Sequence, residues 1–469
     1  MVKPFSLAAL TALPLLSALV LPCPLASAAT DISLDTSTAQ GAALARTEAE
    51  RQSTFMEPQD FLNASQGQTT AGLVQGQVDV GPIINTMLGQ GVRSIYLPCG
   101  FYKLATTINL PSYAKLQGAG ACTVLSLQSS TGDGIAGRNV SFTSLRDFTM
   151  EADVVKQSGA AIAYYNAFET GIENIPFTNG LVNNVQGLHY DNIYLEGANS
   201  THISHVSGRG ASHNGITATG RSKRAEDTYV TSSGFDSYGR APLELIWASG
   251  VYLSSLDLLH GQAAGILVDP DISKSQEVDG LRATAVLGDS NIGPGWLLGG
   301  SGPITEFNIT NCWGSTNGFK PGTMDSAGLA PAQGFALTNP AANGVTVASS
   351  EFHANTGAGI DIEQGTHIIV NGNAVYMNAY NNPKRFPGIY VGNLPDMVTV
   401  TNNQSGAGGE AQNIQGGTRT SLQSYGIQSS VQPDGHVAQF EGNMGTGNQL
   451  GAFNIPTGGS LIVLGNGGN

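Results

Sequence analysis

A short pattern, a glycine followed by alternating apolar residues, recurs along this chain and constrains its fold more than any other feature. The copies begin at Gly215, Gly265, Gly295, Gly334, Gly359 and Gly388, and one of the same shape begins at Pro242. Their spacing of roughly 22 to 40 residues is typical of a solenoid, in which each repeat buries its apolar face only against its neighbours. Because apolar residues alternate within each copy, each copy reads as a strand with one buried face. One short strand per repeat, followed by turns rich in Gly, Asn and Ser, predicts an all-β fold, a single-stranded parallel β-helix.

Turn asparagines are expected to support such a fold. Amide side chains stacked at equivalent positions can satisfy the backbone groups of the turns, which is a structural role. The asparagines that we expect to stack in this way are Asn214, Asn291, Asn311, Asn355, Asn371 and Asn373.

The first 28 residues have the form of a secretory signal peptide. Lys3 supplies the positive start, residues 5–21 are apolar, and Ala26-Ser27-Ala28 is a small-residue cleavage site. The apolar run is too short and too rich in proline for a good membrane span. We therefore expect a secreted or periplasmic protein that does not cross a membrane.

Charge limits the partners of the chain. The net charge is −14 and only 12% of the residues are charged, while the one basic cluster covers residues 221–224. Nucleic acid and anionic membranes are therefore poor partners. A polyanionic substrate is disfavoured too, unless a metal ion mediates its binding.

Two cysteines are spaced for a disulfide. Cys99 and Cys122 are 23 positions apart, about one repeat. Residues one repeat apart stack at about 4.8 Å in a β-helix, which allows disulfide geometry in an exported protein. The alternative is a pair of buried, reduced thiols. Cys312 is expected to be a buried packing residue.

The repeats divide the chain into four parts. Residues 1–28 are the signal peptide, residues 29–75 an N-terminal extension, residues 76–405 the β-helix, and residues 406–469 a Gly-rich segment. Apolar residues recur at helical spacing over Val78–Gln90, which predicts an α-helix that caps the first repeat. The last segment either caps the far end or forms a contact between subunits of a homo-oligomer.

The opening repeats carry a family resemblance. The runs Ser94–Tyr102, Thr107–Pro111 and Ala114–Gly120 combine strands with Leu-Pro and Leu-x-Gly-x-Gly turns. This arrangement resembles the first turns of the pectin-lyase-like superfamily. The resemblance implies a right-handed β-helix, but it does not specify the chemistry, since this superfamily includes lyases, hydrolases, epimerases, transferases, tailspikes and adhesins.

One group of residues is the best candidate for catalysis. Glu244 and Asp269 are outward-facing on neighbouring repeats, offset by two residues, so they are diagonal neighbours about 7–8 Å apart. Two carboxyls in different environments can cleave a glycosidic bond by general acid/base catalysis. Asp236, Arg240 and His260 lie in the adjoining turns and would support this pair. The alternative is that Glu244 pairs with Arg240 on a solvated surface.

Further residues are candidates for binding. Exposed aromatic rings stack on sugars, which favours Tyr238, Trp247 and Tyr390 as substrate-binding residues, with Asp271 beside them. Asp361 and Glu363 alternate on one strand; solvated surface, catalysis and calcium binding all remain open for them. Asp269-Pro270-Asp271 fits either a calcium site or a turn. We expect no cofactor, with calcium as the one alternative, and no metal site among the histidines.

The family's catalytic motifs are incomplete in this chain. The Asp-Asp pair of polygalacturonase-type hydrolases is missing, and Leu245 stands where pectate lyases of the main class have a second Arg. Gly239-Arg240 with Glu244 resembles a short element of difructose-anhydride-forming fructotransferases. We therefore expect an enzyme that cleaves or rearranges glycosidic bonds of a neutral or weakly charged polysaccharide, as a hydrolase or a lyase. The alternative is a non-catalytic surface or glycan-binding protein of the adhesin type.

The surroundings of Glu244 and Asp269 can separate these two hypotheses. Residues 321–333 and 378–387 read as longer loops that leave the repeats. A groove walled by these loops beside the two carboxylates favours the enzyme, whereas a flat, open face favours the binding protein.

Overall fold

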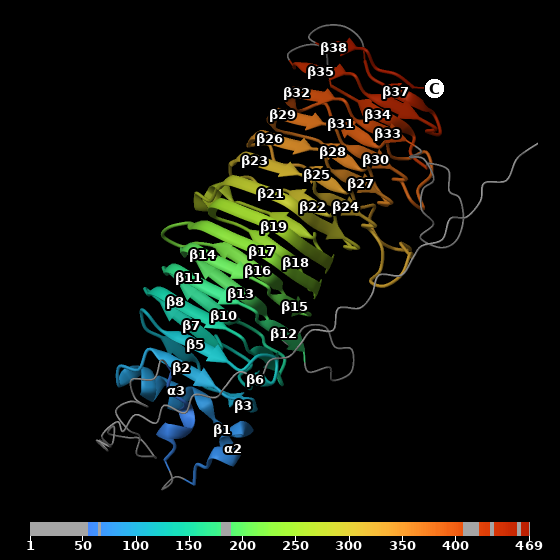
Figure 1. The fold of residues 1–469 in the computed structure, drawn as a ribbon. Coiled ribbons are helices and arrows are strands. Elements are labelled where there is room, and N and C mark those ends of the chain that lie inside the picture. The colour runs from blue at the N-terminus through green and yellow to red at the C-terminus, as the bar shows by residue number, and fades with distance from the viewer. Residues whose placement is uncertain are drawn as a thin grey trace, which may run out of the picture.

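The chain forms an elongated parallel β-helix (Figure 1). The computed structural model describes residues 55–63, 67–179, 189–406, 422–431, 436–456 and 461–468. The predicted signal peptide and most of the N-terminal extension, residues 1–54, lie outside the described residues. One sheet has 13 strands, one per turn of the solenoid, so the described part has about 13 turns. The predicted all-β, right-handed parallel β-helix is therefore confirmed.

The 13-strand sheet contains the strands that the Gly repeats predict. Its strands are β4 (Ile108–Leu110), β7 (Ile135–Arg138), β10 (Ala160–Tyr165), β13 (Asp191–Glu196), β16 (Asn214–Thr219), β18 (Ala241–Leu245), β20 (Ile266–Val268), β22 (Trp296–Leu298), β25 (Phe335–Leu337), β28 (Ile360–Ile362), β31 (Ile389–Val391), β34 (Tyr425–Ser429) and β37 (Gly451–Asn454).

The second sheet has 25 strands and supplies two arms to most turns. Its strands are β1 (Gln75–Asp79), β2 (Ser94–Leu97), β3 (Gly100–Leu104), β5 (Lys115–Gly118), β6 (Thr123–Leu127), β8 (Ser141–Arg146), β9 (Thr149–Ala152), β11 (Phe168–Glu173), β12 (Pro176–Asn179), β14 (Asn199–Ser204), β15 (Ser207–Arg209), β17 (Ala225–Tyr238), β19 (Ala248–Gly261), β21 (Val278–Asp289), β23 (Ile304–Thr310), β24 (Trp313–Ser315), β26 (Ala342–Ala348), β27 (Glu351–His353), β29 (Thr366–Asn371), β30 (Ala374–Tyr376), β32 (Asp396–Thr401), β33 (Gln404–Gly406), β35 (Ala438–Glu441), β36 (Met444–Thr446) and β38 (Leu461–Leu464).

In β17, β19 and β21 the two arms are continuous. Each of these strands bends at a residue with positive φ, namely Ser232, Ser255 and Ala285. The segments after the bends pair in register, and β24, β27 and β30 continue the same row. We call this row, residues 233–238, 256–261 and 286–289 followed by β24, β27 and β30, the second arm.

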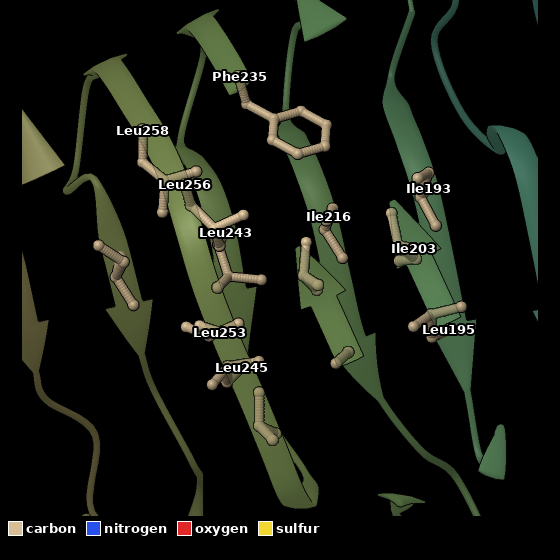
Figure 2. Packing of buried hydrophobic residues seen from close by; sticks show 14 of the residues in the cluster. Ile193, Leu195, Ile203, Ile216, Phe235, Leu243, Leu245, Leu253, Leu256 and Leu258 are labelled. Carbon is tan, nitrogen blue, oxygen red and sulfur yellow. The ribbon is translucent and has the colours of Figure 1, made fainter. Parts of the chain in front are cut away.

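The core is a column of equivalent side chains. Ile216, Leu243 and Ile266 are register partners on successive turns, and Trp296, Phe335, Ile360 and Ile389 continue the column. All of them are buried, and Figure 2 shows Ile216 and Leu243 among the leucines and isoleucines of neighbouring turns. Burial of one such side chain contributes about 1.5–3 kcal/mol. The one buried face predicted for each copy of the pattern is confirmed.

Glycine precedes these core residues because the turns approach one another closely. A Cβ atom at Gly295 would lie 2.5 Å from the carbonyl oxygen of Gly288 and 2.7 Å from that of Gly334. A side chain at this position would therefore separate neighbouring turns. This steric requirement explains why the repeat is visible in the sequence.

Amide ladders run along the turns, as predicted for three of the asparagines. Asn291, Asn317, Asn355 and Asn378 form one ladder, in which each side chain and backbone N–H donates to the next amide oxygen. A second ladder links Asn373, Asn403, Asn443 and Asn466. Asn214, Asn311 and Asn371 are not in these two ladders: Asn214 bonds Glu244, Asn311 has a positive φ, and Asn371 accepts from Thr401 and Asn402.

Helices lie at the N-terminal end of the solenoid (Figure 1). They are η1 (Pro58–Phe61), α2 (Thr70–Val74) and α3 (Val80–Gly89). Asp79 caps α3, because its carboxylate accepts from the Gly81 N–H at 3.1 Å. α3 contacts β3 and β4, and Val80, Ile84 and Met87 are buried in the core. The predicted helix is present, and its capping function stays a prediction.

The ladders continue beyond residue 405 at the other end. β34 pairs with β31, β35 with β32, and β36 with β33, and β37 and β38 follow. Part of the Gly-rich segment therefore has the same β-helical architecture as the preceding turns. Whether this segment contacts another subunit stays a prediction.

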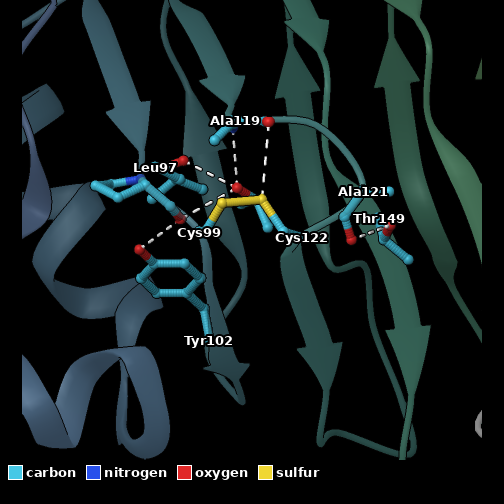
Figure 3. The surroundings of a disulfide bond; sticks show 9 residues. Leu97, Cys99, Tyr102, Ala119, Ala121, Cys122 and Thr149 are labelled. Atoms are coloured by element: carbon cyan, nitrogen blue, oxygen red, sulfur yellow. Dashed lines mark hydrogen bonds between the residues drawn. A yellow bond between two sulfur atoms is a disulfide. The ribbon is translucent and has the colours of Figure 1, made fainter.

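The predicted disulfide joins Cys99 to Cys122 across one turn (Figure 3), with Cα atoms 4.8 Å apart. Hydrogen bonds surround it: the Tyr102 hydroxyl donates to the Pro98 carbonyl oxygen at 2.9 Å, and the Thr123 hydroxyl donates to that of Leu97 at 3.0 Å. Cys312 is a free, buried thiol, as expected.

We expect loss of this bridge to destabilise the first turns. The bridge closes a loop with a sequence separation of 23, and restricting such a loop in the unfolded chain contributes about 3 kcal/mol. The Cys99→Ser/Cys122→Ser variant should therefore unfold at lower urea concentration than the oxidised protein. Dithiothreitol should lower the midpoint of the unmodified protein in the same way and leave the variant unchanged. Equal midpoints for all samples would contradict a stabilising bridge.

Candidate active site

The structure places the predicted catalytic residues in two groups. Arg240, Glu244 and Asp269 form one group. Arg240 Nε donates to Glu244 Oε1 at 2.7 Å, and Arg240 Nη2 donates to Asp269 Oδ2 at 2.8 Å. Asp236 and His260 form the other group on the second arm.

Glu244 is enclosed by its partners. Its side chain is 2% exposed, and Asn214 Nδ2 donates to Oε2, so both carboxylate oxygens have a hydrogen-bond donor. Burial raises the pKa of the Glu244 carboxyl above its usual range, and Arg240 and Asn214 offset part of this rise. The Arg240 side chain and the Asp269 side chain are each 38% exposed. The pairing with Arg240 matches the ion-pair alternative, but Glu244 is buried rather than on a solvated surface, which leaves its carboxylate little access to a substrate.

A cleft of about 340 Å³ lies beside this ion-pair group. Arg240, Glu244 and Asp269 line it themselves, and turn residues such as Pro270 and Gln276 form the rest of its walls. Asp271 caps the short helix η3 (Ile272–Lys274) and accepts from the Ser273 N–H at 2.9 Å. Its pKa is lowered by the hydrogen bond from the Ser273 side chain. The turn interpretation of Asp271 is therefore sufficient, and the predicted longer loops do not wall this cleft.

The predicted aromatic residues lie apart from one another. Trp247 lies at the corner between β18 and β19, near Gly220. Tyr390 is on β31, five strands along the sheet from Glu244, and its hydroxyl donates to Ser430 Oγ at 3.1 Å. Tyr238 ends β17, and its side chain lies outside the described part of the structure. The binding functions of all three stay predictions.

The second arm carries an acidic face, which we define as Asp236, Asp257, His260 and Asp289. The three carboxylates alternate with the buried residues Phe235, Leu256, Leu258 and Val286, so they point outward. Asp236 and Asp289 lie two turns apart, with Leu259 as their common register partner. Asp257 precedes Leu259 by two residues and is a diagonal neighbour of both carboxylates.

An Asp–His pair orients the imidazole of the acidic face. His260 Nδ1 lies 2.5 Å from Asp236 Oδ1. Because a carboxylate can only accept, Nδ1 carries the proton and donates this hydrogen bond, and Nε2 is the nitrogen that keeps a lone pair. Partial burial raises the pKa of the Asp257 carboxyl, and Asp289 and Asp236 raise it further. Asp289 Oδ1 accepts from the hydroxyl groups of Ser290, Ser315 and Thr316.

A cleft of about 440 Å³ opens on the acidic face. His260, Asp289, Trp313 and His353 line it from the second arm, and residues 319–324 line it from the loop after β24. This loop, between β24 and β25, includes the predicted long loop of residues 321–333. One of the two predicted long loops therefore does wall a cleft. The cleft lies beside Asp289 rather than beside Glu244.

Aromatic side chains continue from the acidic face along the second arm. Trp313 is 37% exposed, and its Nε1 donates to His353 Nδ1 at 3.0 Å. Burial lowers the pKa of His353 to about 4, so this imidazole is neutral at pH 7. The ring of Tyr376 stacks on that of His353, with centroids 4.9 Å apart.

Sequence reasoning missed Asp257, Asp289, Trp313 and His353. It followed the Gly-initiated strands, which belong to the 13-strand sheet. The acidic face lies on β17, β19 and β21 of the 25-strand sheet. A signal was available, because Asp289, Ser315, His353 and Tyr376 each lie two residues before an asparagine of the first ladder. A residue two positions before an asparagine of this ladder can therefore be predicted to face outward on the second arm.

The described residues show neither a cluster of metal ligands nor a membrane-spanning helix. Within the described ranges, no three His, Cys, Asp or Glu side chains come together closely enough to hold a metal ion. No helix in the part of the chain that the structure describes is long and apolar enough to cross a membrane.

Comparison with known proteins identifies the fold. No family model matches the sequence, and no curated protein matches it. The A-module of the mannuronan C-5 epimerase AlgE6 from Azotobacter vinelandii is similar in structure, with 15% identity, coverage of 85% of this chain and 97% of that chain, and a TM-score of 0.53. Tailspike protein 3 of bacteriophage CBA120 has 13% identity, coverage of 90% and 63%, and a TM-score of 0.57. PfbA, a surface adhesin of Streptococcus pneumoniae, has 12% identity, coverage of 88% and 90%, and a TM-score of 0.50.

At these identities the similarity extends to the fold alone. The chain has the right-handed parallel β-helix fold of the pectin-lyase-like proteins, as the resemblance of its opening turns predicts.

We expect Arg240→Leu to destabilise the protein because it leaves the buried Glu244 carboxylate without its cation. Removing one partner of a buried ion pair costs about 3–5 kcal/mol. The loss at pH 7 should shrink as the pH falls, because Glu244, whose pKa is already raised, then becomes a neutral acid. Urea unfolding at pH 7 and pH 5 measures both effects.

The Arg240→Leu/Glu244→Gln double variant is the control for this prediction. It removes the buried charge together with its partner and should recover most of the lost stability. An equal loss in the single and the double variant would contradict a charge effect.

Proposed function

We propose that this protein is an exported enzyme that cleaves or rearranges glycosidic bonds of a neutral or weakly charged polysaccharide. The observation that carries this proposal is the acidic face, where Asp289 and the Asp236-oriented His260 line a loop-walled cleft and Asp257 lies beside them. Grooves of this kind, with a few polar groups and perturbed carboxyls, are typical of active sites.

Asp257 and Asp289 are the acid/base pair that we favour. The raised pKa of Asp257 suits a general acid that protonates the glycosidic oxygen. Asp289, whose Oδ1 accepts hydrogen bonds from neighbouring hydroxyl groups, would act on the opposite side of the glycosidic bond. Diagonal strand positions are about 7–8 Å apart at their backbone, so the side-chain rotamers decide whether the two carboxyls take the retaining or the inverting separation. His260 Nε2, oriented by Asp236, would accept or hold a proton at the same place.

Glu244 and Asp269 remain the second candidate pair. Asp269 is partly exposed to the smaller cleft, but both Glu244 oxygens already accept hydrogen bonds. Binding of substrate by Glu244 would require the Arg240 and Asn214 bonds to open. We therefore rank this pair below the acidic face.

The charge of the larger cleft favours neutral substrates. Asp236, Asp257 and Asp289 are close to it, Arg209 Nε lies 3.6 Å from Asp236 Oδ2, and the Lys320 ammonium from the loop pairs with Asp325 at 2.6 Å, which leaves a surplus of negative charge. A polyuronate would be repelled by this arrangement. The exposed Trp313 ring offers an apolar surface for a sugar.

Depolymerisation of a panel of neutral and acidic polysaccharides tests the proposal, with reducing ends and the absorbance of unsaturated products both followed. We expect reducing ends from a neutral glycan. Asp257→Asn and Asp289→Asn should each lower the rate about 10²–10⁴-fold, since each removes a proton-transfer group. Glu244→Gln and Asp269→Asn are matched carboxyl-to-amide controls and should retain activity per folded molecule, with folding checked by circular dichroism.

Other results would change the assignment. Loss of activity only in Glu244→Gln and Asp269→Asn would move the site to the smaller cleft, and unsaturated products would show a lyase. If glycans bind but none is cut, the non-catalytic, adhesin-type alternative replaces the enzyme.

A further inference from the structure

A second group of carboxylates lies far along the 13-strand sheet from Glu244. Asp361 is on β28, between Ala336 of β25 and Tyr390 of β31 in register, and Glu363 follows it by two residues. The two side chains therefore share the outward side of the sheet. Asp361 is nevertheless only 9% exposed.

The hydrogen bonds of Asp361 are incomplete. Gln333 Nε2 donates to Asp361 Oδ2 at 2.9 Å, whereas Oδ1 is buried and has no hydrogen-bond partner among the described residues. A buried carboxylate oxygen without a partner is costly, because its charge has lost water and gained no donor.

No described cation pairs with either of these two carboxylates. Neither Asp361 nor Glu363 forms an ion pair with a Lys, Arg or His of the described chain, although most buried carboxylates in proteins are paired. Burial and the neighbouring Glu363 raise the pKa of Asp361 to about 7, and burial also raises the pKa of Glu363. The group thus carries uncompensated negative charge whenever both carboxyls are ionised.

Gly392 allows Glu363 to lie close to the next turn. A Cβ atom at Gly392 would be 2.7 Å from Glu363 Oε2. The Glu363 carboxylate therefore rests over a backbone position without a side chain, on the same turn as Tyr390. Any larger residue at 392 would displace it.

We propose that Asp361 and Glu363 bind one calcium ion. Calcium prefers carboxylate and amide oxygens in flexible geometry, and the Gln333 side-chain oxygen is available because its Nε2 makes the bond to Asp361. Water molecules would supply the remaining ligands. The ion would satisfy Asp361 Oδ1 and neutralise the two carboxylates. This inference does not depend on the proposed enzymatic function.

Isothermal titration of the EDTA-treated protein with calcium chloride tests the proposal, together with thermal unfolding in EDTA and in calcium. We expect about one ion per chain and a higher Tm in calcium. Because protons compete with calcium for carboxylate ligands, calcium affinity should fall as the pH decreases from 8 to 6. The groups that face Asp361 are Glu363, Gln333 and Tyr390, and Glu363 titrates in the same direction.

Asp361→Asn keeps the shape and removes the charge. It should abolish binding of calcium, and in EDTA it should be at least as stable as the unmodified protein, because it relieves a buried, unpaired carboxylate. Glu306→Gln, a carboxyl-to-amide change at an exposed position of β23, is the matched control and should bind calcium normally.

The proposal is overturned if the full chain takes up no calcium, or if Asp361→Asn binds calcium as well as the unmodified protein. It is also overturned if Asp361→Asn lowers the Tm equally in EDTA and in calcium, since Asp361 would then be a hydrogen-bonding residue of the fold.

Discussion

The stacking of equivalent residues on successive turns is the constraint on which the rest of this structure depends. Each apolar position of the 13-strand sheet meets the same position of the next turn, so one register error would misplace every later side chain. The amide ladders add a polar column to this apolar one and satisfy backbone groups of the buried turns. Gly295 and its equivalents keep the turns close enough for both columns to form.

The same constraint positions the acidic face. Side chains alternate along the strands of the second arm. Because Phe235, Leu258 and Val286 are buried, the three carboxylates of the acidic face point outward on a rigid surface. The loop after β24 leaves the solenoid next to this surface and encloses a cleft over it. A rigid arm with one projecting loop therefore places the Asp289 carboxylate, the imidazoles of His260 and His353, and the Trp313 ring along one groove.

Much of the fold was predictable from the sequence, because the repeat is a direct consequence of close packing between turns. The strands after Gly265, Gly334 and Gly359 are present with the predicted inward phase, and the Cys99–Cys122 spacing led to the correct bridge. The site was less predictable. Arg240, Glu244 and Asp269 do lie together, but Asp236 and His260 project from a different sheet, so proximity in sequence did not bring all five residues together. Which carboxylates share a groove depends on the bends at Ser232, Ser255 and Ala285, and these residue types do not signal a positive φ.

The central claim is that a glycan lies on the acidic face. Hydrogen–deuterium exchange of the Asp289→Asn variant, with and without the polysaccharide that the unmodified enzyme degrades, tests it directly. The account predicts slower exchange in residues 286–290, 313–324 and 351–353 when the glycan is present. Protection confined to residues 240–246 and 269–276 would contradict it and would place the glycan beside Arg240 instead.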